Sequence, residues 1–198
     1  MTETGRPMRA DARRNRERIM AAAGELFARL GRDAQMEDIA AHCGLGMGTL
    51  YRHFPSKQAL LTAMVRERFK GMAGLARAAE QVADPGEAFE TILRSYLEAA
   101  DGDASFQLAL MGSGDLEWEG VEQQKTEFTE IVTRIIGRAT ASGQLRSDFT
   151  FGDFRVLARG VMATMYFRHG GNADWRRHLD LVLDGVRVPA RSAPRRTG

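Results

Sequence analysis

The sequence predicts an all-α protein. Apolar residues recur at helical spacing along most of the chain, and no convincing runs of alternating apolar and polar residues indicate strands. Only five prolines interrupt the 198 residues, so the periodic stretches stay long. We expect about nine helices, and a chain of this length holds one large or two small domains.

Residues 1–11 are predicted to form a disordered basic arm. They contain Arg6 and Arg9 beside Gly5 and Pro7, and almost nothing apolar to bury. Basic N-terminal arms can lie along DNA phosphates or in a minor groove. A solvated tail that aids solubility is the alternative interpretation.

The first helix is expected to run from about Arg13 to Leu30 and to end at Gly31. Its apolar positions form a one-sided stripe, which suits a helix that covers the core of a small domain. The stripe consists of Ile19, Ala23, Leu26, Phe27 and Leu30.

Residues 36–57 are predicted to form two short helices joined by a tight turn. The first, Met36 to Cys43, has apolar residues at i, i+3, i+4 and i+7. Gly44 breaks it where a positive φ is often needed, and a second helix runs from about Met47 to His53 before Pro55. This is the spacing of a helix-turn-helix, whose second helix enters the DNA major groove. An ordinary corner in a helical core has the same spacing.

The side chains of the second short helix favour DNA binding. Leu50 and Phe54 share one face and are expected to pack inward. The outward residues carry hydroxyl, guanidinium and imidazole groups, which contact phosphates and base edges. Ser56 is suited to cap the next helix, whose first turn offers free N–H groups and a cation to a phosphate. The predicted DNA contacts are Met47, Gly48, Thr49, Tyr51, Arg52, His53 and Lys57.

The stretch IAAHCGLGMGTLYRHFPSKQALL closely resembles the DNA-binding domain of the TetR family of transcriptional repressors. The resemblance extends back through RERIMAAAGELFARLG and covers about residues 12–72. Family members usually carry Thr or Ser where Gln35 stands, as the N-cap of the second helix. They usually carry Ser and a basic residue where Gly46 and Met47 stand. Losing the basic residue weakens the attraction to phosphates and leaves Met47 to touch a thymine methyl.

The resemblance implies the domain organisation. The helix-turn-helix motif occupies residues 35–54 of a three-helix DNA-binding domain at 12–57, and a helix at 58–82 links it to the rest. Residues 83–188 form the helical ligand-binding and dimerisation domain, and residues 189–198 form a disordered tail. In this domain the periodicity predicts helices at about 86–100, 106–111, 121–142, 153–168 and 175–188.

Aromatic residues and methionines of the C-terminal half could line a ligand cavity, because such clefts are mostly apolar with a few polar groups. The same spacing is also that of a plain core. The candidate ligand-binding residues are Tyr96, Phe106, Met111, Trp118, Phe128, Met162 and Tyr166.

The last two helices carry enough apolar residues for half of a four-helix dimer interface, as in TetR-like proteins. The alternative places the same residues in the core of one chain. The candidate interface residues are Leu157, Val161, Thr164, Leu179, Leu183 and Val186.

Enzyme, metal and cofactor chemistry is not predicted. His42 and His53 belong to the helix-turn-helix, and His169 and His178 have no cysteine or carboxylate cluster beside them. The acidic run Asp115, Glu117, Glu119 and Glu122 could imitate a site for a hard cation, but a solvated face is the simpler interpretation. A single cysteine, Cys43, and the absence of a signal peptide or membrane span fit the cytoplasm.

The charge distribution agrees with a DNA-binding head. Residues 1–57 carry a formal charge of +3, residues 58–186 carry −5, and residues 187–198 carry +4. We therefore expect a homodimeric regulator that represses transcription until an apolar or amphipathic small molecule releases it from a palindromic DNA operator. One alternative is a small-molecule binding protein with a degenerate DNA-binding head. A more remote one is an enzyme that uses the acidic loop and His169.

Overall fold

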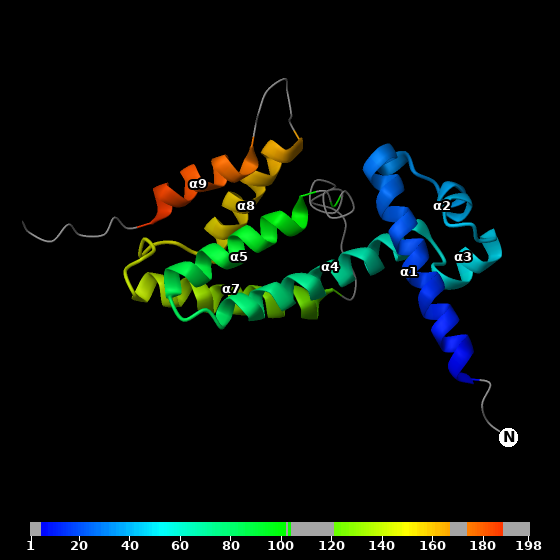
Figure 1. Ribbon diagram of the computed structural model, residues 1–198, viewed down its shortest axis with the longest axis horizontal. Coiled ribbons are helices and arrows are strands. Elements are labelled where there is room, and N and C mark those ends of the chain that lie inside the picture. The colour runs from blue at the N-terminus through cyan, green and yellow to red at the C-terminus, as the bar shows by residue number, and fades with distance from the viewer. Residues whose placement is uncertain (1–4, 102, 104–120, 167–173, 188–198) are drawn as a thin grey trace, which may run out of the picture. The chain divides into compact units, whose positions relative to one another are not determined.

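The computed structural model describes residues 5–101, 103, 121–166 and 174–187, and this part of the chain is helical with no strands (Figure 1). The all-α prediction is therefore confirmed. The described residues form eight α-helices and one short 3-10 helix at Gly31–Asp33. The α-helices are α1 (Gly5–Leu30), α2 (Met36–His42), α3 (Met47–His53), α4 (Lys57–Glu80), α5 (Pro85–Ala100), α7 (Glu122–Ala141), α8 (Phe151–Tyr166) and α9 (Trp175–Val186). The predicted helix at 106–111 lies outside the described residues.

The described residues divide into two compact units. The first holds α1 to α3, α4 up to Lys70 and the first two residues of α7. The second holds α4 from Gly71 on, α5, α7 from Gln124 on, α8 and α9. Because α4 contributes residues to both units, the division falls inside this helix and not at its ends.

Helix α1 begins earlier than the sequence predicted. Residues 5–11 belong to the helix, so they are not a disordered arm; residues 1–4 lie outside the described part. Pro7 falls in the first turn, where a backbone N–H would have no partner within the helix. Beyond it, Asp11 and Arg14 form an ion pair one turn apart. Leu30 was also expected to be buried, but 39% of it is exposed at the end of the helix.

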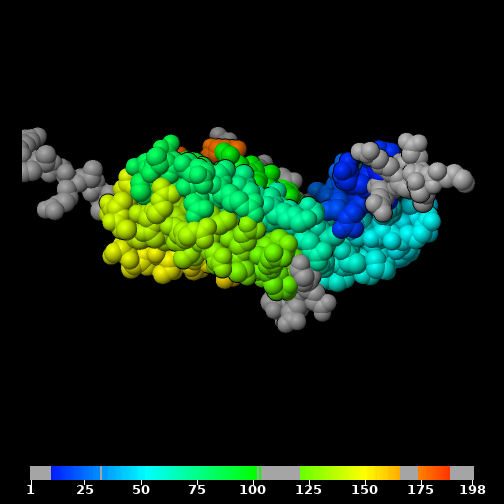
Figure 2. Space-filling view, turned by 90° about the horizontal axis from the view of Figure 1, so that it is seen from below, coloured from blue at the N-terminus to red at the C-terminus, as the bar shows by residue number. Residues whose placement is uncertain are grey.

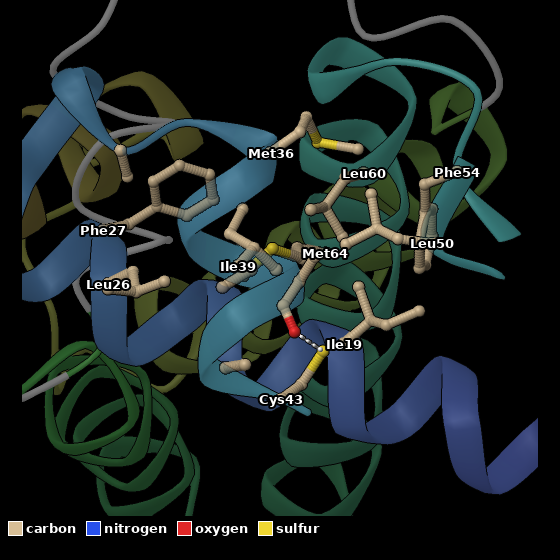
Figure 3. Close-up of a cluster of buried hydrophobic side chains, with 14 of the residues drawn as sticks. Ile19, Leu26, Phe27, Met36, Ile39, Cys43, Leu50, Phe54, Leu60 and Met64 are labelled. Carbon is tan, nitrogen blue, oxygen red and sulfur yellow. Dashed lines mark hydrogen bonds between the residues drawn. The ribbon is translucent and has the colours of Figure 1, made fainter. Parts of the chain in front are cut away.

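The core of the first unit is a single apolar cluster between α1, α2, α3 and the start of α4 (Figure 3). Ile19, Ile39, Leu50 and Leu60, one from each of the four helices, are all fully buried. Each fully buried aliphatic side chain stabilises the fold by about 1.5–3 kcal/mol. The cluster therefore holds the two short helices, which would be marginal on their own, in one arrangement.

The turn between α2 and α3 has the predicted geometry. Gly44 has a φ of +64°, in the left-handed region that favours glycine. The Arg18 side chain of α1 reaches the turn, where its Nη2 donates to the carbonyl oxygen of Cys43 at 2.7 Å. Inside the unit, the Cys43 Sγ donates to the carbonyl oxygen of Ala40 at 3.6 Å, as drawn in Figure 3. The Arg18 bond ties the turn to α1, and the Cys43 bond closes the end of α2.

In the second unit, α7 lies along the end of α4 (Figures 1 and 2). The Arg134 Nε donates to the carboxylate of Glu80 at 2.7 Å. The Arg138 guanidinium donates to the carbonyl oxygens of Glu80 and Val82 at 2.7 and 2.8 Å. These bonds satisfy carbonyls that the end of α4 leaves without helical partners. Asp84 then caps α5 by accepting from the backbone N of Glu87 at 2.8 Å.

The contact between Glu80 and Arg134 predicts a contribution to acid sensitivity. The hydrogen bond and charge of Arg134 hold the pKa of the Glu80 carboxyl below its usual value of 4.5. Its stabilisation is therefore fully present above about pH 4.5 and is lost as the pH falls through the lowered pKa. Glu80→Gln should cost about 0.5–1 kcal/mol at pH 7 and should flatten the loss of stability below pH 4.5.

Urea unfolding between pH 3 and pH 7 measures this difference. The matched control is Glu98→Gln, on an exposed position of α5. An equally steep loss of stability in the Glu80 variant and the wild type would show that this carboxylate does not contribute.

Candidate DNA-binding surface and C-terminal site

Helix α3 is placed by two buried side chains. Leu50 is fully buried and Phe54, at the C-cap, is 1% exposed. Gly46 provides the N-cap with an ordinary extended backbone, φ −67° and ψ 146°. Because the apolar side of α3 is anchored to the core, its opposite side faces outward, as the spacing predicted.

The outward side of α3 carries most of the predicted DNA contacts. Gly48 and Arg52 are exposed, Tyr51 is 42% exposed, and Thr49 and His53 are half-buried. The Arg52 Nη2 donates to the Thr49 Oγ1 at 3.0 Å, and its Nε donates to the Gly48 carbonyl oxygen at 3.2 Å. The guanidinium therefore lies along its own helix beside a hydroxyl. Both groups can exchange these bonds for bonds to base edges or phosphates.

Two of the predicted contacts are partly engaged with the protein. Met47 is half-buried and packs against the apolar core, so only part of its side chain is available to a thymine methyl. Lys57 is half-buried, and its Nζ lies 5.8 Å from the centroid of the Phe27 ring. Lys57 lies in the first turn of α4, as expected, and is its first residue. The predicted cap is also confirmed, because the Ser56 Oγ accepts from the backbone N of Ala59 at 3.0 Å.

Sequence reasoning missed a polar groove beside α3. The groove, of about 620 Å³, is lined by Arg16 of α1, by His53 and Phe54 at the end of α3, and by residues from Ser56 to Arg66 at the beginning of α4. Arg16 of α1 lies over the Phe54 ring, with its guanidinium carbon 4.5 Å from the ring centroid. Arg66 of α4 also lines the groove. The arginine-rich start of α1 was the only sign of this groove in the sequence. Spacing along the chain does not show which of these arginines lines it.

The unusual Gln35 does not prevent α2 from forming. Its backbone N donates to the carboxylate of Asp38 at 3.0 Å, so the start of the helix is closed from within the first turn. Its side-chain Nε2 donates to the Asp33 carbonyl oxygen at 2.7 Å. The departures at Gln35 and Gly46 therefore leave the helix-turn-helix intact.

In the second unit, two of the candidate ligand-binding residues stack on each other. The rings of Tyr96 and Phe128 lie 5.8 Å apart at 24°, and Phe154 packs against both. Met162 is buried, 4% exposed. Phe154 was predicted on its helix but not in the site. Phe106, Met111 and Trp118 lie outside the described residues, as does the side chain of Tyr166.

The structure corrects half of the predicted dimer interface. Val161, Leu179 and Leu183 are at most 1% exposed within one chain, so a second chain cannot touch them. Leu157, Thr164 and Val186 are half-buried. The large apolar side chains that α8 and α9 expose are Val156, at 72%, and Leu181, at 60%. The two helices can still form an interface, but through the faces opposite to their main apolar stripes.

The described residues include no group of three or more histidine, cysteine or carboxylate side chains that could hold a metal ion. Of the predicted acidic run, only Glu122 is described; Asp115, Glu117 and Glu119 are not. Among the described helices, none is long and apolar enough to cross a membrane.

Comparisons with known proteins cover both units. The tetR family of bacterial regulatory proteins matches at residues 19–64, and the C-terminal domain of SbtR-like transcriptional regulators matches at residues 84–188. A crystal structure of a TetR transcription regulatory protein from Mycobacterium vanbaalenii has 31% identity and a TM-score of 0.63. It covers 92% of this chain and 100% of its own.

Two further relatives extend over most of the chain. TetR transcriptional regulator SCO0520 from Streptomyces coelicolor has 30% identity and a TM-score of 0.60, and covers 88% of this chain and 99% of its own. The HTH-type transcriptional repressor KstR2 from Rhodococcus jostii is 27% identical over 88% of this chain and 92% of its own.

Proposed function

Because the chain belongs to the TetR family of bacterial regulatory proteins, we propose that it is a homodimeric repressor that a small molecule releases from a palindromic operator. That the chain is a DNA-binding transcriptional regulator follows from the family. The proposal that the regulator represses transcription, and does not activate it, is supported by the relative KstR2, which is itself named a repressor. Cytoplasmic location and the absence of catalytic activity are part of the same proposal.

The observation that carries the proposal is the geometry of α3. Its buried residues anchor it to the core, and Thr49, Tyr51 and Arg52 are left on the outward side of a helix only two turns long. A helix of this kind fits the major groove, and a two-fold dimer would bring two of them to half-sites roughly 34–36 Å apart. The alternative of a degenerate DNA-binding head, which rested on Gln35, Gly46 and Met47, is not favoured. Gln35 and Gly46 leave the motif intact, and the half-buried Met47 belongs to α3 and packs against its core.

The effector is proposed to bind in the second unit, near the stacked rings of Tyr96 and Phe128. The aromatic and apolar character of this cluster favours an apolar or amphipathic molecule. A coupling of about 1–3 kcal/mol between this site and α3 would change operator affinity roughly 5- to 150-fold.

The direct test is a gel-shift assay with the full chain and the promoter region that adjoins its own gene. We expect a shifted band that persists in an excess of random competitor DNA. If random competitor DNA abolishes the shifted band at the same concentration as unlabelled promoter DNA does, the protein does not recognise a specific operator.

Tyr51 is proposed to contact a phosphate, because it is the exposed hydroxyl beside the buried anchor Leu50. Tyr51→Phe removes the hydroxyl alone and should weaken binding to operator and to random DNA by a similar factor, about fivefold for one hydrogen bond. Fluorescence anisotropy on both DNAs measures this. A changed base preference with unchanged affinity for random DNA would mean that Tyr51 reads a base.

Lys57 is proposed to neutralise one phosphate at the start of α4. Lys57→Ala should lower the slope of log affinity against log salt by roughly one unit. Lys125→Ala, an exposed position of α7 in the second unit, is the control and should leave the slope unchanged. Equal slopes for the wild type and the Lys57 variant would show that the ammonium group stays over Phe27 when DNA binds.

A further inference from the structure

Helix α3 is too short to fix its own position. It has seven residues, and helices shorter than about 12–15 residues are marginal in water on their own. Gly48, Thr49 and Tyr51 rank below alanine as helix formers, and Gly46, the N-cap, has no side chain to close the first turn. Within the helix, Leu50 is the one buried residue. The contacts just outside its two ends therefore decide how α3 presents its outward side.

The turn before α3 is held by Arg18 of α1. The Arg18 Nη2 donates to the carbonyl oxygen of Cys43 at 2.7 Å, and a Cβ built on Gly44 would lie 3.9 Å from the same nitrogen. The guanidinium thus covers the turn. The N–H groups of Gly44 and Leu45 donate to carbonyl oxygens inside α2, at 3.2 and 3.0 Å. The turn closes the end of α2 with these bonds and is joined to α1 through the Cys43 carbonyl.

The residue after α3 is held by Arg16 of the same helix. Phe54 is the C-cap of α3, and the guanidinium carbon of Arg16 lies 4.5 Å from the centroid of its ring. A guanidinium over an aromatic face is attracted to the electrons of the ring. Phe54 is 1% exposed, so its ring is enclosed between this arginine and the core. Arg16 thus covers the end of α3 as Arg18 covers the turn before it.

The spacing of the two arginines lets one helix reach both ends of α3. Ile19 of α1 is fully buried and belongs to the apolar cluster of the first unit (Figure 3). At about 100° per residue, Arg18 lies roughly 100° to one side of Ile19 and Arg16 lies roughly 60° to the other. Helix α1 therefore enters the core with Ile19 and places one arginine on each side of it.

We propose that Arg16 and Arg18 are positioning residues for DNA recognition, which hold the two ends of α3 and so set the angle at which Arg52 meets base edges. The inference rests on the operator binding proposed above. A hydrogen bond to a base edge needs a narrow range of distance and angle, whereas phosphates follow the whole backbone. A change in the tilt of α3 should therefore cost operator affinity and leave most of the electrostatic attraction to random DNA.

A phosphate contact is the other role open to these arginines, and Arg16 also lines the groove beside α3. The two roles differ in what they do to binding. An arginine that binds a phosphate adds about one unit to the slope of log affinity against log salt and acts on all DNA sequences alike. A positioning arginine changes the ratio of operator affinity to random-DNA affinity and leaves the slope unchanged.

Arg18→Met and Arg16→Met remove the guanidinium and keep an unbranched apolar stem. Operator binding should weaken about tenfold in Arg18→Met, which loses a hydrogen bond from a charged donor, and about fivefold in Arg16→Met, which loses the contact with the ring. Random DNA should be bound within about twofold of the control, with an unchanged salt slope. The matched control is Arg29→Met, at an exposed position in the last turn of α1. Fluorescence anisotropy at several salt concentrations measures all three variants.

Hydrogen exchange of the full chain without DNA tests the positioning itself. The amides of Thr49, Leu50 and Phe54 donate within α3 or to its N-cap. They should exchange at least about fivefold faster in both methionine variants than in the control, because the ends of α3 are no longer held. The amide of Leu60 in α4 should exchange as in the control. Since no DNA is present, this result is independent of whether the protein recognises an operator.

Arg18→Lys is the conservative variant, because it keeps the charge and an N–H donor for the Cys43 carbonyl. It should recover most of the operator affinity that Arg18→Met loses. A lysine variant that binds the operator no better than the methionine variant would show that this hydrogen bond does not position α3. If Arg18→Met does not fold, Arg18→Gln takes its place with the same expectations.

Three further results would overturn the proposal. A salt slope lowered by about one unit, with operator and random DNA weakened alike, would show that the arginine binds a phosphate. Exchange of the Leu60 amide that accelerates as much as that of Leu50 would show that the arginine only stabilises the whole unit. Operator affinity and α3 exchange equal to those of the control would show that these contacts do not hold α3.

Discussion

Val156→Glu is expected to leave a folded monomer that has lost most of its affinity for a two-half-site operator. Val156 is 72% exposed in a single chain, so a glutamate there is solvated and the protomer keeps its core. In the proposed dimer the same carboxylate enters an apolar contact, twice by symmetry, at a cost of several kcal/mol of association. Because two recognition helices must bind together, operator affinity falls with the dimer.

Sedimentation and circular dichroism together measure this result. Val161→Glu is the matched comparison, five residues further along α8 but 1% exposed, so it should unfold the second unit by burying an unpaired charge. A Val156 variant that remains dimeric and binds its operator normally would place the interface elsewhere. A Val161 variant that remains folded would contradict the core described above.

Arg52→Ala is expected to relax the base preference of the protein. The exposed guanidinium lies beside Thr49 on the outward side of α3. The commonest base-specific contact of an arginine is a bidentate pair of hydrogen bonds to the guanine edge. Losing such a contact should weaken operator binding by about 1–3 kcal/mol, or roughly 5- to 150-fold, with a smaller loss on random DNA.

The comparison uses Arg29→Ala, which removes the same charge from an exposed position in the last turn of α1. Binding of both variants is measured to operator and to operators with one changed base pair. If Arg52→Ala weakens operator and random DNA by equal factors, the guanidinium binds a phosphate and carries no sequence information.

Local rules were sufficient to predict the DNA-binding head. The four-residue spacing of Leu50 and Phe54, the break at Gly44 and the cap at Ser56 depend on neighbours along the chain, and the structure has all of them as expected. The predicted start of α1 was wrong. The composition of residues 1–11 indicated disorder, but Pro7 lies within the first helical turn, where a proline does not stop a helix.

The C-terminal half depends on contacts between distant segments, and there the prediction was only partly right. Spacing identified the apolar stripes of α8 and α9 but not what covers them. Val161 and Leu183 lie on the main stripe of each helix, and a helix buries that stripe in its own core first. Val156 and Leu181 stand outside the stripes, and only the structure shows that they remain exposed.

The groove beside α3 was missed for the same reason. Arg16 and Arg66 are 50 positions apart in the sequence, and only folding brings both to the side of His53. Their shared positive charge makes the groove a natural continuation of the surface that we propose to meet DNA phosphates.

The most direct test of the central claim is selection of bound DNA from sheared genomic fragments by the purified full-length chain. The account predicts enrichment of fragments that share an inverted repeat, with half-site centres about one helical turn apart. It also predicts that the Arg52→Ala variant captures the same regions but tolerates more than one base at a position where the wild type requires one. Fragments with no common sequence, captured equally by the wild type and this variant, would contradict the claim that α3 reads an operator.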